Sequence, residues 1–441
     1  QGAVSALTVV ALVRSTEDSI TRKVCSKALY NLLDATETIE RMVEEGLVGA
    51  LTALSGIDDE TMEFFAEGVC NVAQYKCGRV EVGKERVLRT LLAIVDGENT
   101  TMHRACAQTL CNLSCFDDGA YCFPVAKAGG LGALKKLVTT FQSSSDREME
   151  EVCTRTLCAL ACDETSREIF LEDGGLHLLM GLGQTDNDDI KFQCANVLLS
   201  LALGGNTCIL AVRQGAMALL FTIAHSKEKR TQLACARSLL LFSEQEENRL
   251  SIIEQKGVGI AKLLSQTELG RKIAMRALTL LSRTKTEEAA AKMVESSAVL
   301  EIGNMIGLSI EGGVLENDGE EGGRLSWEMV LTLSEDDESM LMDACIAVTQ
   351  LSVKSNTSRM VADNATECLV AFLEKFPNRE SVRERVACAL RNLSCHSGNL
   401  VRMVKAGASK WLIKLSSDPA LQTQQHCMVG LCNMADMEDV R

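Results

Sequence analysis

Proline and aromatic residues are scarce in this sequence. The chain has 441 residues with only three prolines and 4% aromatic residues, whereas hydrophobic residues make up 46%. A β-sandwich depends on aromatic and β-branched strand residues, so this composition argues against that fold. The abundant Leu, Ala, Met, Glu and Lys favour helices instead.

Long apolar runs and basic runs are also missing. No apolar run reaches the roughly 18 residues typical of a membrane span, and no signal peptide is recognisable at the start. The formal net charge is −15, and no cluster of Lys and Arg would attract nucleic acid or an anionic membrane. We therefore expect no direct nucleic-acid partner and no transmembrane segment.

Motifs for catalysis and for metal binding are absent as well. The five histidines are scattered along the chain, and there is no G-x-S-x-G, G-x-x-x-x-G-K-[ST], G-x-G-x-x-G or H-E-x-x-H motif. The 19 cysteines include no C-x-x-C pair, which zinc sites commonly use. We expect no enzymatic activity, no cofactor and no metal site.

What the sequence has in quantity is internal repetition. An apolar segment of the type x-A-L-x-N-L-x recurs ten times, for example as CSKALYNLL (Cys25–Leu33) and CAQTLCNLS (Cys106–Ser114). We call the place of the motif Asn the register position. Its ten occupants are Asn31, Asn71, Asn112, Ala159, Ser200, Leu241, Leu280, Gln350, Asn392 and Asn433, with successive spacings of 40, 41, 47, 41, 41, 39, 70, 42 and 41. A period near 40 residues predicts a solenoid of stacked helical units.

A second signature lies between the register positions and contains a glycine. It reads MVEEGLVGAL (Met42–Leu51), VAKAGGLGAL (Val125–Leu134) and IIEQKGVGIAKLL (Ile252–Leu264), among others. Glycine ends a helix readily because it adopts a left-handed backbone conformation without strain. The signature therefore predicts a short helix, a sharp glycine turn and a second helix in each repeat.

Together the two signatures resemble the armadillo repeat, in which a short first helix, a glycine turn and a second helix precede a third helix with the A-L-x-N-L motif. The resemblance covers essentially the whole chain. It implies an all-α fold, a right-handed α-solenoid (armadillo superhelix) of about ten three-helix repeats, and a single domain over residues 1–441 that is truncated at both ends. HEAT repeats, which are helix pairs, are the nearest alternative.

The spacing of 70 residues indicates one repeat plus an insertion, which we place at residues 309–339. Residues Glu311–Glu321 read EGGVLENDGEE, and acidic, glycine-rich sequence buries too little apolar surface to order itself. We expect a solvated surface loop with one short helix around Trp327–Leu333. The alternative is an acidic strap that occupies the groove or presents Trp327 to a partner.

Cysteine recurs at one position of the repeat, six residues before the register position. A small residue type at a fixed helical position indicates packing, since a free cysteine behaves as a small hydrophobe. We therefore expect a reduced, intracellular and cytoplasmic protein, with the nucleus and the cilium as alternatives. The members of this column are Cys25, Cys106, Cys153, Cys194, Cys235 and Cys427.

The armadillo resemblance implies that the third helices line a concave groove into which the motif Asn points. An amide both donates and accepts hydrogen bonds, so it can bind the backbone of an extended peptide; the alternative is that each Asn merely caps or bridges helices. The predicted binding residues are Asn31, Asn71 and Asn112 at the front and Asn392 and Asn433 at the back.

One helical turn before the register position lie further candidates on the same face, namely Lys27, Gln108, Arg155, Arg237 and Arg276. The arginines suit carboxylate or phosphate groups of acidic or phosphorylated segments; the alternative is that they are ordinary surface residues. Importin-α adaptors carry Trp at this position, and this chain does not, so its groove resembles that of β-catenin more closely.

These features predict a protein–protein interaction scaffold or adaptor that binds extended segments of partner proteins in its groove. A structural subunit of a large ciliary or cytoskeletal assembly is the alternative. A nuclear transport adaptor is a weaker alternative because the Trp array is missing.

Overall fold

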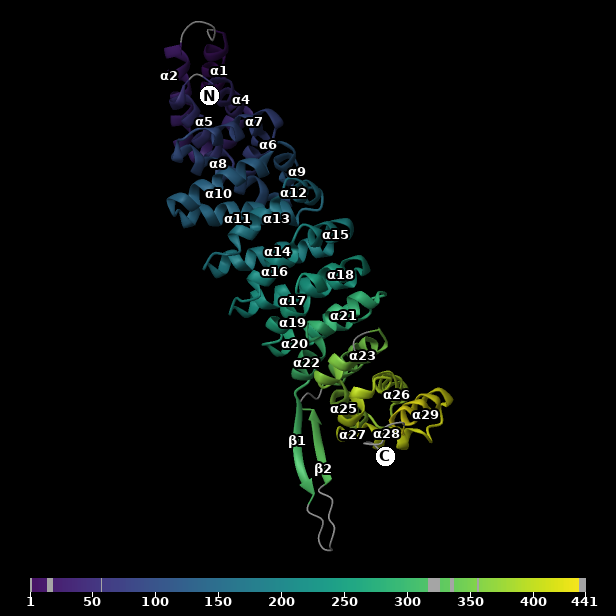
Figure 1. Ribbon diagram of the computed structural model, residues 1–441. Helices are drawn as coiled ribbons and strands as arrows, with labels where there is room; N and C mark the ends of the chain where they lie inside the picture. The colour runs from purple at the N-terminus through teal and green to yellow at the C-terminus, as the bar shows by residue number, and fades with distance from the viewer. Residues whose placement is uncertain are drawn as a thin grey trace, which may run out of the picture. The chain divides into compact units, whose positions relative to one another are not determined.

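The computed structural model describes residues 2–13, 19–56, 58–315, 326–333, 337–354 and 357–435 (Figure 1). The chain divides into two compact units, Gln1–Gly215 and Ala216–Arg441, and each is described by itself. Helices dominate both units and follow one another in the order first, second and third helix of a repeat.

The third helices contain the ten A-L-x-N-L segments. In the first unit they are α2 (Ser19–Asn31), α5 (Asp59–Val72), α8 (Thr100–Cys115), α11 (Arg147–Cys162) and α14 (Asp188–Leu203). In the second unit they are α17 (Lys229–Glu244), α20 (Glu268–Ser282), α23 (Glu338–Lys354), α26 (Glu380–Ser394) and α29 (Leu421–Ala435).

The first and second helices are shorter. The first helices are α3 (Ile39–Glu44), α6 (Lys76–Val82), α9 (Cys122–Lys127), α12 (Arg167–Glu172), α15 (Gly205–Arg213), α18 (Glu246–Glu254), α21 (Glu287–Glu295), α24 (Thr357–Ala362) and α27 (Ser397–Lys405). The second helices are α1 (Ala3–Val13), α4 (Leu47–Leu54), α7 (Glu85–Ala93), α10 (Gly130–Ser144), α13 (Gly175–Leu182), α16 (Ala216–Ile223), α19 (Gly257–Leu264), α22 (Ala298–Met305), α25 (Ala365–Lys375) and α28 (Ala408–Leu415). Short 3₁₀ turns lie at Leu32–Asp34, Thr36–Thr38, Ile94–Asp96 and Asp117–Gly119.

Neighbouring third helices pack against one another within each unit. In the first unit α2, α5, α8, α11 and α14 contact in that order, and in the second unit α17, α20, α23, α26 and α29 do the same. The motif leucines, such as Leu29, Leu110 and Leu157, are fully buried in this seam. The expectation of an all-α solenoid is therefore confirmed.

The cysteine column is part of the same seam. All six members are buried, and Cys106 and Cys194 have no exposed surface. Burial raises the pKa of each of these two thiols to about 12, because a thiolate is poorly solvated in an apolar interior. The column therefore serves packing, as predicted.

The glycine turn is confirmed, with one difference. Gly46 and Gly129 adopt φ angles of 91° and 92°, in the left-handed region that favours glycine. In the segment IIEQKGVG the left-handed residue is instead Lys256, with φ 66°. Gly257 follows in helical conformation, where a Cβ would lie 2.5 Å from the Ile252 side chain.

Non-glycine residues at this turn use their side chains to contact a neighbouring element. The Lys256 ammonium lies 5.2 Å from the centre of the Phe221 ring. Ser297, with φ 60°, accepts a hydrogen bond from Arg359. A cation–π contact or a hydrogen bond of this kind contributes about 1 kcal/mol, which is comparable to the cost of a left-handed conformation.

The insertion contains a pair of antiparallel strands, β1 (Leu308–Leu315) and β2 (Ser326–Leu333), in which Leu308 faces Leu333 and Ile310 faces Leu331. The helix expected around Trp327–Leu333 is therefore wrong. In the segment SWEMVLTL every second residue is a large apolar one (Trp327, Met329, Leu331 and Leu333), a spacing typical of a strand. Its base packs on the helical repeats, since β1 contacts α22 and α25 and β2 contacts α25 and α27. The surface loop expected over the insertion 309–339 is also wrong at residues 309–315, which belong to β1. Residues 316–325 and the Trp327 side chain lie outside the described part.

A recurring arginine caps the third helices. Arg79, Arg167 and Arg249 each lie eight residues after a register position and donate to carbonyl oxygens at the end of the preceding third helix. Arg79 Nη1 lies 3.1 Å and 2.9 Å from two such oxygens, and its Nε lies 2.6 Å from Asp117 Oδ2. These carbonyls have no partner within their own helix, so the guanidinium joins the first helix to the third.

No single helix of the described residues is long and apolar enough to span a membrane. The consecutive helices α15 and α16, which are bent by 77° at a short break, reach that length and apolar composition only when they are counted together.

We predict that Gly174→Ala lowers the free energy of unfolding by about 1 kcal/mol. Gly174 has a φ of 80°, and no atom lies within 4 Å of an added Cβ, so the cost comes from the backbone alone. Gly132→Ala is the matched control, because Gly132 also has open space around it but lies in the helix α10. It should stabilise the chain by about 0.5–1 kcal/mol. Urea denaturation followed by circular dichroism measures both changes, and equal effects of the two substitutions would contradict the turn assignment.

We also predict that Arg79→Ala lowers the free energy of unfolding by roughly 2 kcal/mol, because it leaves buried carbonyls without a donor. The Arg79 side chain is only 8% exposed. Arg89→Ala is the control, since Arg89 is 72% exposed and pairs only with Glu85 one turn away; its loss should stay below about 0.5 kcal/mol. Thermal denaturation of the two variants tests the difference, and a loss at Arg79 no larger than at Arg89 would refute the capping role.

Candidate protein-binding face

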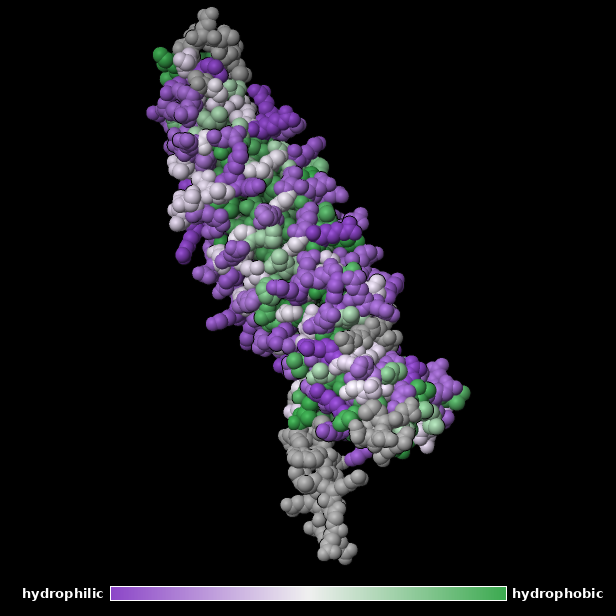
Figure 2. All heavy atoms as spheres, viewed as in Figure 1, coloured by the Kyte–Doolittle hydropathy of each residue, from purple (hydrophilic) through white to green (hydrophobic). Residues whose placement is uncertain are grey.

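The side of the stacked third helices that carries the register positions is the candidate site, and we call it the ladder face. Figure 2 shows hydrophilic side chains over much of the drawn surface, with hydrophobic ones between them along the stacked helices. In the first unit Asn31 is exposed at the end of α2, and Asn71 is half-buried in α5. Within the described residues neither amide group makes a hydrogen bond.

Asn112, the third member, is more deeply placed. It is only 5% exposed in α8, and Gln108 Nε2 donates to its Oδ1 over 3.0 Å. The Asn112 Nδ2 atom is buried and has no hydrogen-bond partner in the described structure.

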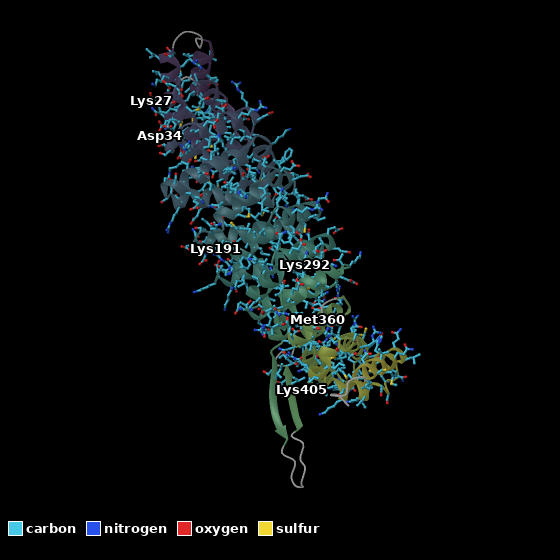
Figure 3. All side chains as sticks on the ribbon, viewed as in Figure 1. Lys27, Asp34, Lys191, Lys292, Met360 and Lys405 are labelled. Carbon is cyan, nitrogen blue, oxygen red and sulfur yellow. The ribbon has the colours of Figure 1, made fainter. Side chains whose placement is uncertain are left out.

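The front of the ladder face is rich in carboxylates. Tyr30 Oη donates to Glu67 Oε2 over 2.6 Å and links α2 to α5. This hydrogen bond, followed by burial and by the charges of Glu67, Asp34 and Glu63, raises the pKa of Tyr30 to about 12. Lys27 is exposed on the same helix, and Figure 3 shows it on the same edge of the first unit as Asp34. Both signs of charge are therefore available to a partner here.

The three candidate arginines differ in availability. Arg155 on α11 and Arg237 on α17 are exposed, and neither makes an ion pair within the described residues. Arg276 on α20 is already paired, since its Nη1 lies 2.5 Å from Asp343 Oδ1 of α23. A partner's carboxylate would have to displace Asp343, which is only 9% exposed.

A hollow that the sequence did not indicate lies between the ends of α8 and α11. It has a volume of about 510 Å³, and its lining includes Cys115, Ala159 and Cys162. Ala159 stands where other repeats have Asn, so its small side chain leaves the register position open. Nearby, Cys111 Sγ lies 3.7 Å from Cys115 Sγ, and this contact lowers the pKa of Cys111, with Arg155 adding to the effect. No group of three His, Cys, Asp or Glu residues suited to a metal ion occurs in the described ranges.

The back of the ladder face uses its polar groups within the chain. Asn433 Nδ2 donates to Ser394 Oγ of the preceding repeat over 3.0 Å. Asn392 Oδ1 accepts from Arg391 Nη2 over 2.9 Å. Asn433 thus bridges two helices, as the alternative interpretation expects, whereas Asn392 bonds only to its neighbour within α26.

Tryptophan is absent from the third helices at the position one turn before the register. Trp411 lies on the second helix α28, where the Lys414 ammonium is 4.3 Å from its ring centre. The side chain of Trp327 is outside the described part.

Comparisons with known proteins give one similarity in sequence. No protein-family model matches the chain. The Armadillo segment polarity protein of Musca domestica is 27% identical over 126 residues, which cover 28% of this chain and 15% of that protein. The matched region thus spans a small part of the relative.

Among solved structures, an engineered protein is similar over 98% of both chains, with 20% identity and a TM-score of 0.49. A designed armadillo repeat protein, solved in complex with the peptide (KR)4, covers 58% of this chain and 98% of its own length, with 15% identity and a TM-score of 0.41. The three-helix repeat and its left-handed turn resemble those of armadillo repeats, and the similarity in sequence is to an armadillo protein.

Proposed function

We propose that the chain is a protein-binding scaffold or adaptor that holds extended segments of partner proteins along the ladder face. The observation that carries this proposal is the pair of unbonded amides, Asn31 and Asn71, on the adjacent third helices α2 and α5. An amide can bond to the backbone of a peptide whatever its sequence. A peptide advances about 3.3 Å per residue, and packed helices lie roughly 8–10 Å apart, so each repeat would meet two or three peptide residues.

Side-chain selectivity would come from the exposed charges on the same face. Lys27, Arg155 and Arg237 are exposed, and the fork of an arginine suits a carboxylate or a phosphate. Glu63 and Glu67 would in turn attract cationic residues near the front. The partner segment we expect is therefore of mixed charge rather than uniformly basic.

A structural role in a large ciliary or cytoskeletal assembly is the second candidate. It is favoured by the internal bonding of Arg276 and Asn433, which leaves less of the second unit's ladder face for a peptide. Co-sedimentation of the chain with microtubules would support this role, and its absence together with peptide binding would support the first.

We further propose an intracellular, cytoplasmic location and no catalytic activity. The buried cysteine column supports a reducing compartment, since these thiols are used as packing residues. The lack of catalytic sequence motifs supports the second statement.

Replacing Asn31, Asn71 and Asn112 together by Ala should weaken the binding of peptides selected by phage display on the intact chain by at least about tenfold, because two or three hydrogen bonds are lost. Fluorescence anisotropy measures the affinity, and circular dichroism checks that the helices remain. Asn206→Ala is the control, because Asn206 is exposed in the first unit but lies on the first helix α15. An unchanged affinity in the triple variant would refute the ladder assignment.

A further inference from the structure

An open cavity lies on the ladder face of the second unit, among α23, α26 and α29. Its volume is about 370 Å³, within the range of small ligand sites. Its lining includes Thr349 and Gln350 from α23, Ser381, Glu384 and Arg385 from α26, and His426 from α29. These three helices stack consecutively, so three repeats contribute polar groups to one hollow.

Gln350 lines this cavity, and within the described residues its amide N–H groups have no acceptor. Its Oε1 accepts a hydrogen bond from Ser282 Oγ over 2.8 Å. The carbonyl end of the amide is therefore occupied by the preceding repeat. The amide nitrogen retains two N–H groups for a ligand.

His426 is likewise left with a donor. Its Nδ1 lies 3.1 Å from Arg391 Nη1. A guanidinium only donates, so Nδ1 accepts and the ring proton resides on Nε2. Burial, followed by the charge of Arg391, lowers the pKa of His426, which keeps the ring neutral with one N–H to offer.

Arg385 adds the positive charge. It is exposed on α26, and its guanidinium makes no ion pair within the described residues. The Thr349 hydroxyl already donates to the carbonyl oxygens of Cys345 and Ile346, so it offers only an acceptor. Glu384 is the single carboxylate in the lining.

We propose that this cavity, defined by Gln350, Arg385 and His426, binds a carboxylate side chain of an acidic peptide segment. Side chains with donor groups from three helices line it, and a planar carboxylate accepts from a guanidinium in a paired geometry. This proposal shares one assumption with the proposed function, namely that a peptide runs along the third helices. It assigns a specific chemistry to the second unit, where the Asn residues are bonded within the chain.

The test uses the intact chain and a fluorescently labelled hexaglutamate peptide, with hexaglutamine as the uncharged comparison. The net charge of the chain is −15, so non-specific electrostatics oppose hexaglutamate, and binding requires a local site. Arg385→Gln should weaken hexaglutamate binding by about tenfold, the effect of losing one charge-assisted contact. His426→Phe should weaken it by a smaller factor, since a neutral donor is lost.

Lys405→Gln is the matched control, because Lys405 is exposed on α27 (Figure 3) and does not line the cavity, so the substitution removes one positive charge elsewhere. It should leave the affinity unchanged. Equal affinity of Arg385→Gln and the unaltered chain, or equal binding of hexaglutamine and hexaglutamate, would overturn the proposal. Binding of a phosphoserine peptide without binding of hexaglutamate would also overturn it, because the ligand would then be a phosphate.

The triple Ala variant of Asn31, Asn71 and Asn112 separates this proposal from the proposed function. Hexaglutamate should bind this variant as well as it binds the unaltered chain, while the display-selected peptides bind it weakly. If the triple variant binds hexaglutamate more weakly than the unaltered chain does, the assignment of the cavity as the carboxylate site is overturned. If the triple variant still binds the display-selected peptides tightly, the ladder assignment is overturned.

Discussion

The close stacking of one third helix on the next is the contact on which the rest of each unit depends. It requires small or slim apolar side chains at the seam, and the buried column that includes Cys106, Cys153 and Cys194 provides them. Each fully buried leucine beside the column, such as Leu157, contributes about 1.5–3 kcal/mol. A single repeat cannot bury such a face alone. The helix caps and turns of one repeat therefore stabilise the fold only when the neighbouring repeats are present.

The same helices also carry the ladder face, because an α-helix makes one turn every 3.6 residues and its side chains therefore point to different sides of the helix. Positions six before the register face the seam, whereas the register position itself lies at or near the surface. The front amides nevertheless differ in accessibility, from exposed Asn31 to buried Asn112. A partner that binds here would thus contact a surface whose geometry is fixed by the packing of the core.

Several polar side chains on the ladder face form a hydrogen bond or an ion pair with the neighbouring repeat. Arg276 pairs with Asp343, and Ser282 donates to Gln350. Such contacts reduce the desolvation cost of half-buried polar groups, and they orient what remains free. The donors around His426 are an example, since internal hydrogen bonds decide which of their atoms can meet a ligand.

The sequence by itself determined the repeat length, the ten third helices, the cysteine column and most of the turns, because each depends on a local, periodic pattern. It did not determine β2, whose pairing with Leu308–Leu315 involves residues outside its own segment. Nor did it show that Lys256 rather than Gly257 makes the turn, or that Arg79 caps a helix. Whether Arg276 is available was decided only by tertiary structure, since its partner Asp343 lies 67 residues away in the chain, beyond the reach of any local pattern.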